Sequence, residues 1–143
     1  MIAFLDSSAL IYYFEGAPRY QKAVIEALAA IKSKDANAQV AVSRLGVMEC
    51  RVKPLREGDA TLLAAYDAFF TQTLIIELSA EVVTLATNIR ALKGLKTPDA
   101  LQAACAISLG AECVFVTGDA GFARLQGLNV QIIHAPSGTS LVE

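Results

Sequence analysis

Short apolar runs alternate with longer segments of mixed polarity along this chain. The runs occupy positions 2–5, 40–43, 74–78, 113–117 and 130–134. Within each run the apolar residues are nearly continuous, without the alternation of polar and apolar residues that marks a strand with one solvated face. Continuous runs of this length are typical of strands buried on both faces of a parallel sheet. We therefore predict that these runs form the strands of one parallel sheet.

The segments between these runs have helical spacing. Residues 20–31 and 60–70 each place their large apolar side chains on one face of a helix. The clearest helix follows Lys96, where Thr97 fits the N-cap, Pro98 the first helical position and Gly110 the C-terminal stop. Strands that alternate with helices predict an α/β fold, a three-layer α/β/α sandwich with a central parallel sheet and right-handed crossovers.

Length and composition favour one soluble domain over residues 1–143, with no linker or repeat. Hydrophobic residues make up 55% of the chain, but the longest stretch without Asp, Glu, Lys, Arg or His, 100–111, is far shorter than the ~20 residues of a membrane helix. The N-terminus has no positively charged region and does not resemble a secretion signal. The high apolar content suggests that a partner or a second subunit covers part of the surface.

Charge and cysteine content exclude several other classes. The chain has 12 Lys and Arg against 14 Asp and Glu, a net charge of -2, which argues against broad coating of nucleic acid but leaves room for a local basic patch. The three cysteines are an odd number without CxxC spacing, and we expect reduced core residues in a cytoplasmic protein. The only histidine, His134, is expected to be structural, so no histidine base or catalytic triad is predicted.

Four acidic residues from distant parts of the chain are predicted to share one edge of the sheet. Parallel strands end where the helices that follow or precede them begin, at the carboxyl edge. Asp6 follows the first run, Asp119 lies just past the run 113–117, and Asp99 lies in the first turn of the helix before that run. Glu49 falls in the second turn of the helix predicted after Ser43.

Each acid also has a structural explanation. Asp6 could cap the following helix, Asp99 could be favoured by the helix dipole, and Asp119 could be a turn residue. Glu49 could be a solvated helix position. Four carboxylates in one cleft would, however, need a counter-charge, and oxygen-only ligands select Mg²⁺ or Mn²⁺. Such ions polarise phosphoryl oxygens and activate water, so the pattern suggests phosphodiester hydrolysis.

With these positions, the chain resembles the PIN domain family, and within it the VapC-type toxin ribonucleases. The resemblance is carried, in this order, by LDSSALI, SRLGVMEC, PDALQAACAISLGA and VFVTGDAGF. It implies a Mg²⁺- or Mn²⁺-dependent endoribonuclease that cleaves single-stranded RNA, forms a homodimer and is inhibited by a small antitoxin whose tail covers the acidic cleft. The residues that match the family's catalytic and metal-binding acids are Asp6, Glu49, Asp99 and Asp119.

Two supporting positions follow from the same resemblance. Thr117 matches the hydroxyl residue that orders the site. Ser8 stands where many relatives carry asparagine, and Ala120 stands where some carry a further acid.

Basic and aromatic side chains near the predicted cleft have two interpretations. Phosphate contacts need cations, and the candidates for RNA contact are Arg44, Arg51, Lys93 and Lys96. The alternative is that these residues only solvate helix faces. Aromatic side chains at 12–14 and 66–70 could stack on bases, but we expect them to pack in the core, those at 66–70 also being able to form an antitoxin groove.

Other functions are less consistent with the sequence. Neither the GxGxxG of a dinucleotide-binding domain nor the GxxxxGK[ST] of a P-loop enzyme is present. A phosphoaspartate enzyme would need a second aspartate where Ser8 stands, and a receiver domain would need an acidic pair near the end of the first strand. The alternative that stays open is a non-catalytic PIN-like scaffold that binds RNA or a protein partner.

Overall fold

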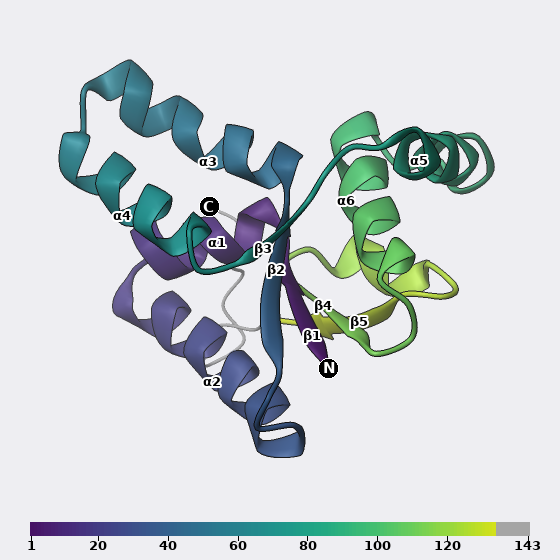
Figure 1. Ribbon diagram of the computed structural model, residues 1–143, viewed down its shortest axis with the longest axis horizontal. Helices are drawn as coiled ribbons and strands as arrows, with labels where there is room; N and C mark the ends of the chain where they lie inside the picture. The colour runs from purple at the N-terminus through teal and green to yellow at the C-terminus, as the bar shows by residue number, and fades with distance from the viewer. Residues whose placement is uncertain (134–143) are drawn as a thin grey trace.

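The computed structural model describes residues 1–133 of the chain (Figure 1). The elements follow one another in the order β1 (Ile2–Leu5), α1 (Ser7–Glu15), α2 (Pro18–Lys34), β2 (Gln39–Ser43), α3 (Arg44–Glu57), α4 (Ala60–Phe70), β3 (Leu74–Ile76), α5 (Ala80–Lys93), α6 (Thr97–Ser108), β4 (Cys113–Thr117), the 3-10 helix η1 (Ala120–Arg124) and β5 (Asn129–Ile132).

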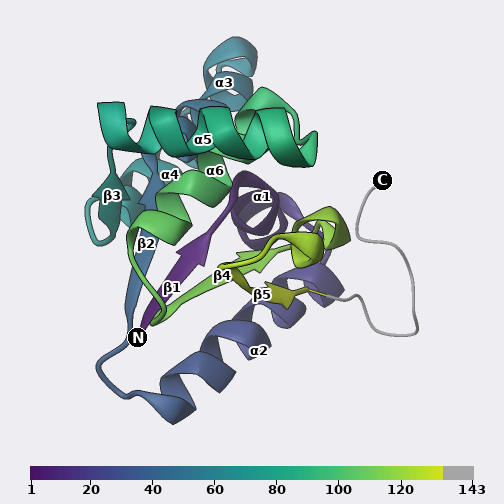
Figure 2. The same cartoon turned by 90° about the vertical axis from the view of Figure 1, so that its right-hand side faces the viewer.

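The five strands form one parallel sheet in the order β3-β2-β1-β4-β5. Helices α1 to α4 cover one face of this sheet and α5 and α6 cover the other (Figures 1 and 2). The predicted α/β three-layer sandwich with a central parallel sheet is therefore confirmed. The strand β1 lies at the centre of the sheet, so the residue that follows it lies deep in the fold.

Burial on both faces explains the continuous apolar runs. In β1, Ala3 and Leu5 belong to the core beneath α1 to α4, whereas Phe4 belongs to the core beneath α5 and α6. Phe4 stacks on Phe115 of the neighbouring strand β4 with ring centroids 5.5 Å apart. All five residues of β4 are buried. Because both faces are covered, neither face of a central strand needs polar residues.

Several predicted boundaries move in the structure. The strand predicted at 74–78 ends at Ile76, and the next residue, Glu77, pairs with Arg44. Helix α6 begins at Thr97 itself, and its N-cap is Lys96, so the N-cap prediction is wrong by one residue. Pro98 fits the second helical position because the first-turn N–H groups of a helix have no intrahelical acceptor. The strand predicted at 130–134 is observed as Asn129–Ile132, and His134 lies outside the described residues.

Packing of aromatic and cysteine side chains follows the sequence interpretation. Tyr66 is fully buried and Phe70 nearly so, and the aromatic residues at 12–14 pack against the same core. Cys50, Cys105 and Cys113 are free and buried, and burial raises the pKa of the Cys50 thiol to about 12. Among the described residues, none of the helices has the length and apolar character needed to cross a membrane.

Candidate functional site

The four predicted acids lie around one cleft at the carboxyl edge of the sheet. Its volume is about 120 Å³, and its lining residues are Asp6, Ser7, Ser8, Glu49, Asp99, Gln102, Asp119 and Phe122. They come from the segments that follow β1 and β4, from α3 and from α6. The fold therefore brings together acids that lie more than a hundred positions apart in the sequence. Their role as metal ligands stays a prediction.

Asp6 is the most buried of these acids, with 5% of its surface exposed. It is also the N-cap of α1, and its Oδ1 accepts a hydrogen bond from the backbone N–H of Ala9 at 2.9 Å. The capping interpretation is thus confirmed, and it does not conflict with a place in the cleft. Burial raises the pKa of Asp6 to about 6, although its hydrogen bonds, first that of Thr117, oppose the increase.

Two hydroxyl groups connect Asp6 to the loop after β4. Thr117 donates to Asp6 Oδ2 at 2.5 Å, and Ser8 donates to Asp6 Oδ1 at 2.7 Å. Ser8 Oγ also accepts the backbone N–H of Gly118 at 3.0 Å. Ser8 therefore bridges the carboxylate and the loop, so the supporting hydrogen bond that was in question at this position is present.

Asp119 is held in its loop by backbone geometry. Its N–H donates to Thr117 Oγ1 at 3.0 Å, and its Oδ1 accepts the N–H of Gly121 at 2.8 Å, which makes it the N-cap of η1. Gly118 allows the loop to approach helix α1, since a Cβ atom built there would lie 2.3 Å from Tyr12 Cε2. Asp119 is exposed to solvent.

Asp99 lies in the first turn of α6, as predicted, and is half-buried. Its pKa is raised, first by burial and then by the negative charges of Asp119 and Glu49, whereas Lys96 lowers it. Because the charges of Asp119 and Glu49 raise the pKa of Asp99, the three carboxylates lie in one electrostatic environment. Removing a proton from Asp99 costs more because its neighbours already carry negative charge.

Glu49 reaches the cleft from the second turn of α3, and two residues that the sequence analysis missed hold it there. Ser7 donates to Glu49 Oε1 at 2.6 Å, and Gln102 donates to the same oxygen at 3.4 Å. Gln102 lies three residues after Asp99, on the same face of α6, in a helix whose other buried residues are alanine or cysteine. A buried glutamine among small apolar residues was the signal that could have identified it.

The donor set fits a hard divalent cation. None of the ion pairs formed by the described residues includes Asp6, Glu49, Asp99 or Asp119, so the negative charge of the cleft is not compensated by a salt bridge. Within residues 1–133, no group of three Asp, Glu, His or Cys side chains is already close enough to hold an ion. Asp119 is exposed and Asp99 and Glu49 are half-buried, so each of these three side chains is in contact with solvent.

The four predicted RNA-contact residues differ in their ion pairs. Arg44 makes two hydrogen bonds to Glu77, and Arg51 pairs with Asp67. Lys93 ends α5 and Lys96 caps α6 close to Asp99; neither forms an ion pair within the described part of the chain. The two lysines are therefore the better candidates for phosphate contacts, a role that stays a prediction.

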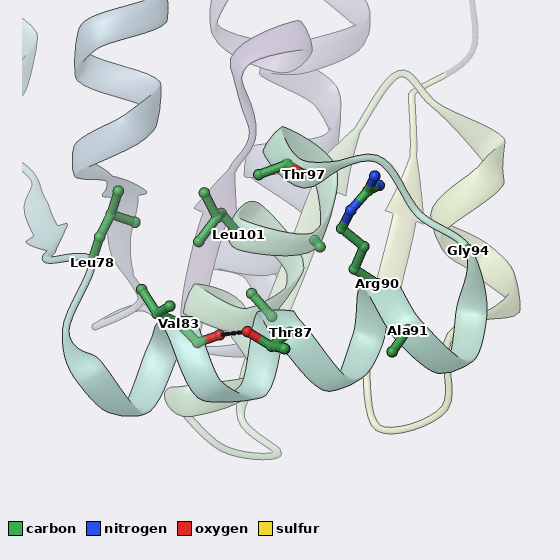
Figure 3. Close-up of a pocket in the computed structure, with 10 residues that line it drawn as sticks. Leu78, Val83, Thr87, Arg90, Ala91, Gly94, Thr97 and Leu101 are labelled. Atoms are coloured by element: carbon green, nitrogen blue, oxygen red, sulfur yellow. Dashed lines mark hydrogen bonds between the residues drawn. The ribbon is translucent and has the colours of Figure 1, made fainter.

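Two apolar hollows lie outside the acidic cleft. One, of about 760 Å³, lies between α5 and α6, with Leu78, Val83 and Leu101 at one end and Arg90 and Gly94 at the other (Figure 3). A second, of about 420 Å³, lies along α3. Leu78 lines both hollows.

Comparison with known proteins gives a family match over most of the chain. The sequence model of the PIN domain matches residues 3–128. None of the curated proteins compared with this chain matches it.

Solved structures with the same fold come from toxin–antitoxin systems. VapBC2 from Rickettsia felis, bound to a DNA fragment from its promoter, has a TM-score of 0.73 and 22% identity over 92% of this chain and 98% of that chain. A toxin–antitoxin complex from Klebsiella pneumoniae has a TM-score of 0.72 and 23% identity over 93% and 98%. VapBC-1 from nontypeable Haemophilus influenzae has a TM-score of 0.72 and 19% identity over 92% and 98%. At these identities the likeness concerns the fold.

Proposed function

This chain belongs to the PIN domain family, and on that premise we propose that it is a Mg²⁺- or Mn²⁺-dependent endoribonuclease that cleaves single-stranded RNA in the cytoplasm. The observation that carries the proposal is the single cleft lined by Asp6, Glu49, Asp99 and Asp119. A cluster of carboxylates without a basic partner is costly unless a cation binds there.

The residues of the cleft have distinct parts in this proposal. The four carboxylates hold the cation, which when bound polarises a phosphate oxygen and lowers the pKa of an attacking water. Thr117 and Ser8 keep both oxygens of Asp6 in place through their hydrogen bonds. Lys93 and Lys96 attract the RNA backbone toward the cleft, whereas Arg44 and Arg51 contribute less because they are already paired with acids.

Cleavage of single-stranded RNA by the purified protein tests the proposal. We expect cleavage with Mg²⁺ or Mn²⁺ and none after EDTA. Asp99→Asn should reduce the rate by at least about a hundredfold, because it removes a charged ligand while α6 keeps its first turn. A matched control is Glu81→Gln, which removes an exposed carboxylate of α5 that does not line the cleft.

The control experiments separate an enzyme from a scaffold. Equal rates for wild type and Asp99→Asn, with contaminating nuclease excluded, would contradict the assignment of the site. RNA binding without cleavage at any concentration of either metal would favour the non-catalytic PIN-like scaffold. Sequencing of the RNA ends produced by the active protein would then identify the cleavage position.

We also propose that the protein is the toxin of a type II toxin–antitoxin pair. The support is its similarity to the structures from Rickettsia felis and Klebsiella pneumoniae, whose names describe toxin–antitoxin complexes. The partner would be a small antitoxin that covers the acidic cleft. A gene for such a protein next to this one, whose product suppresses RNA cleavage when co-purified, would support this role over that of a housekeeping nuclease.

A homodimer is the assembly we propose for the free protein. The support is the two hollows, which share Leu78, and in the second of them Met48, Val52 and Leu55, which are about half exposed on α3. Exposed apolar side chains that gather on one part of the surface are characteristic of interfaces. A second copy of the chain, presenting the same surface, can cover it by a twofold contact.

A further inference from the structure

Gln102 is a buried polar side chain at the base of the acidic cleft, with 3% of its surface exposed. Its buried neighbours in α6 are small and apolar, among them Ala100, Ala103 and Ala106. A side-chain amide in such surroundings is costly unless its oxygen and its nitrogen both have hydrogen-bond partners. Gln102 has partners for both, and they lie on three different elements.

The amide joins α3, α1 and the cleft. Gln102 Oε1 accepts from Ser43 Oγ at 2.7 Å, and Ser43 Oγ in turn accepts the N–H of Gly46 as the N-cap of α3. Gln102 Nε2 donates to Ser7 Oγ at 2.9 Å and to Glu49 Oε1 at 3.4 Å. Ser7 Oγ donates to the same Glu49 oxygen at 2.6 Å.

The chemistry of these partners favours one orientation of the amide. Turned around, the Gln102 carbonyl oxygen would face the Glu49 carboxylate, where two acceptors repel each other. The Ser43 hydroxyl, which already accepts from Gly46, would also lose the acceptor for its own proton. The orientation observed satisfies every group, so the amide presents its donors to Glu49.

We propose that Gln102 is a positioning residue that orients Glu49 for cation binding, directly and through Ser7. Both donors bind Oε1, and the described residues make no hydrogen bond to Oε2, which leaves that oxygen for the ion. This inference rests on the proposed function, because it gives Glu49 a metal to bind. It adds a role for two residues outside the set of acids.

Loss of a residue that orients a metal ligand typically reduces metal affinity by ten- to a hundredfold. We expect this range for Gln102→Met, which keeps the length of the side chain and removes both hydrogen-bonding ends. Ser7→Ala should give a loss in the same range, because it removes the shorter hydrogen bond to Glu49 and leaves only that of Gln102 at 3.4 Å. The readout is the dissociation constant for Mn²⁺, measured by calorimetry on the folded protein without RNA.

A double-mutant comparison distinguishes positioning from a structural role. If Gln102 acts through Glu49, Gln102→Met should not weaken Mn²⁺ binding further in a Glu49→Gln background. A purely structural role would lower the melting temperature and leave the affinity of the folded protein unchanged. Gln72→Met, in an exposed turn, is the control for the same substitution outside the cleft.

The possible outcomes separate this inference from the proposed function. Wild-type protein that neither binds Mn²⁺ nor cleaves RNA would overturn the proposed function. If wild type binds Mn²⁺ and Glu49→Gln weakens binding, but Gln102→Met and Ser7→Ala stay within twofold of wild type, only the positioning role is overturned. Should Gln102→Met fail to fold, Ser7→Ala decides in the same way, since its side chain is only half-buried.

Discussion

Thr117 Oγ1 donates a hydrogen bond of 2.5 Å to Oδ2 of Asp6, and this bond joins residues 111 positions apart in the chain. Thr117 is fully buried at the end of β4, and Asp6 follows the neighbouring strand β1. The same hydroxyl accepts the backbone N–H of Asp119 at 3.0 Å. One side chain therefore supports two of the four acids of the cleft.

Thr117→Val tests this support, since it keeps the shape of the side chain and removes the hydroxyl. We expect a loss of stability of about 1.5–3 kcal/mol, the usual range for a hydrogen bond to a charged group, and weaker Mn²⁺ binding. Thr117→Ser is the matched control: it keeps the hydroxyl and should lose only about 1 kcal/mol for the missing methyl group. Chemical denaturation and Mn²⁺ titration measure both effects, and equal metal affinity in the two variants would contradict the role of the hydroxyl.

The raised pKa of Asp6 predicts that the metal-free protein loses stability as the pH rises. Its folded-state pKa of about 6 lies above the ordinary value of 3.8, so the protonated carboxyl is the form that folding favours. The contribution of Asp6 is therefore fully present below pH 4 and is lost between about pH 4 and pH 6. A pKa difference of about two between the folded and unfolded states corresponds to about 3 kcal/mol in the free energy of unfolding.

Comparison with Asp6→Asn isolates this contribution from those of the other acids. In EDTA, the unfolding free energy of wild type relative to Asp6→Asn should fall by up to about 3 kcal/mol from pH 4 to pH 7. Mg²⁺ should offset the fall, because only the ionised carboxylate binds the cation. If the difference in unfolding free energy between wild type and Asp6→Asn does not change with pH, burial does not raise the pKa of Asp6.

Local patterns in the sequence identified the sheet and the edge where the acids lie. Strand β4 was predicted with its observed bounds because all five of its residues are buried and the run ends at a glycine. Helix α5 was not predicted, because apolar and polar residues alternate irregularly on its exposed side. Its Ser79 cap, the spacing of Val82, Ala86 and Ile89, and the final Gly94 were nevertheless signals of a helix.

The hydrogen bonds inside the cleft could not be predicted in the same way. The contact between Ser7 and Glu49 depends on how α3 packs beside α1, and that arrangement arises from the shared core under both helices. Gln102 differs from its neighbours in α6 only by polarity, and its partners lie 53 to 95 positions away along the chain. Sequence spacing places residues on an element, whereas tertiary packing decides which side chains meet.

Lys93 and Lys96 are predicted to contact the RNA backbone. The double variant Lys93→Glu and Lys96→Glu should weaken binding of single-stranded RNA. The slope of log K against log salt concentration should become less steep by about 0.7 for each phosphate that the protein no longer neutralises. Binding is measured in EDTA at several salt concentrations, so that no RNA is cleaved. Lys32→Glu, an exposed lysine in the last turn of α2, is the control. If the salt dependence of RNA binding is unchanged in the double variant, both lysines are solvated surface charges that do not contact RNA.

The proposed homodimer predicts that a charge introduced at the two apolar hollows separates the two copies. Leu78 lines both hollows, and Val52 is 48% exposed on α3. Leu78→Lys and Val52→Asp each remove apolar area worth about 1.5–3 kcal/mol if it is buried in the interface, so the dimer dissociation constant should rise by at least tenfold. Light scattering should then give the 15.1 kDa mass of one chain in place of twice that mass.

The control variant is Ile25→Asp, which places a negative charge on α2. Ile25 is 52% exposed and lines neither hollow, so this variant should remain dimeric. Wild-type protein with the mass of one chain at micromolar concentration would contradict the dimer. If only Ile25→Asp dissociates the dimer, the interface includes α2 and not the two hollows.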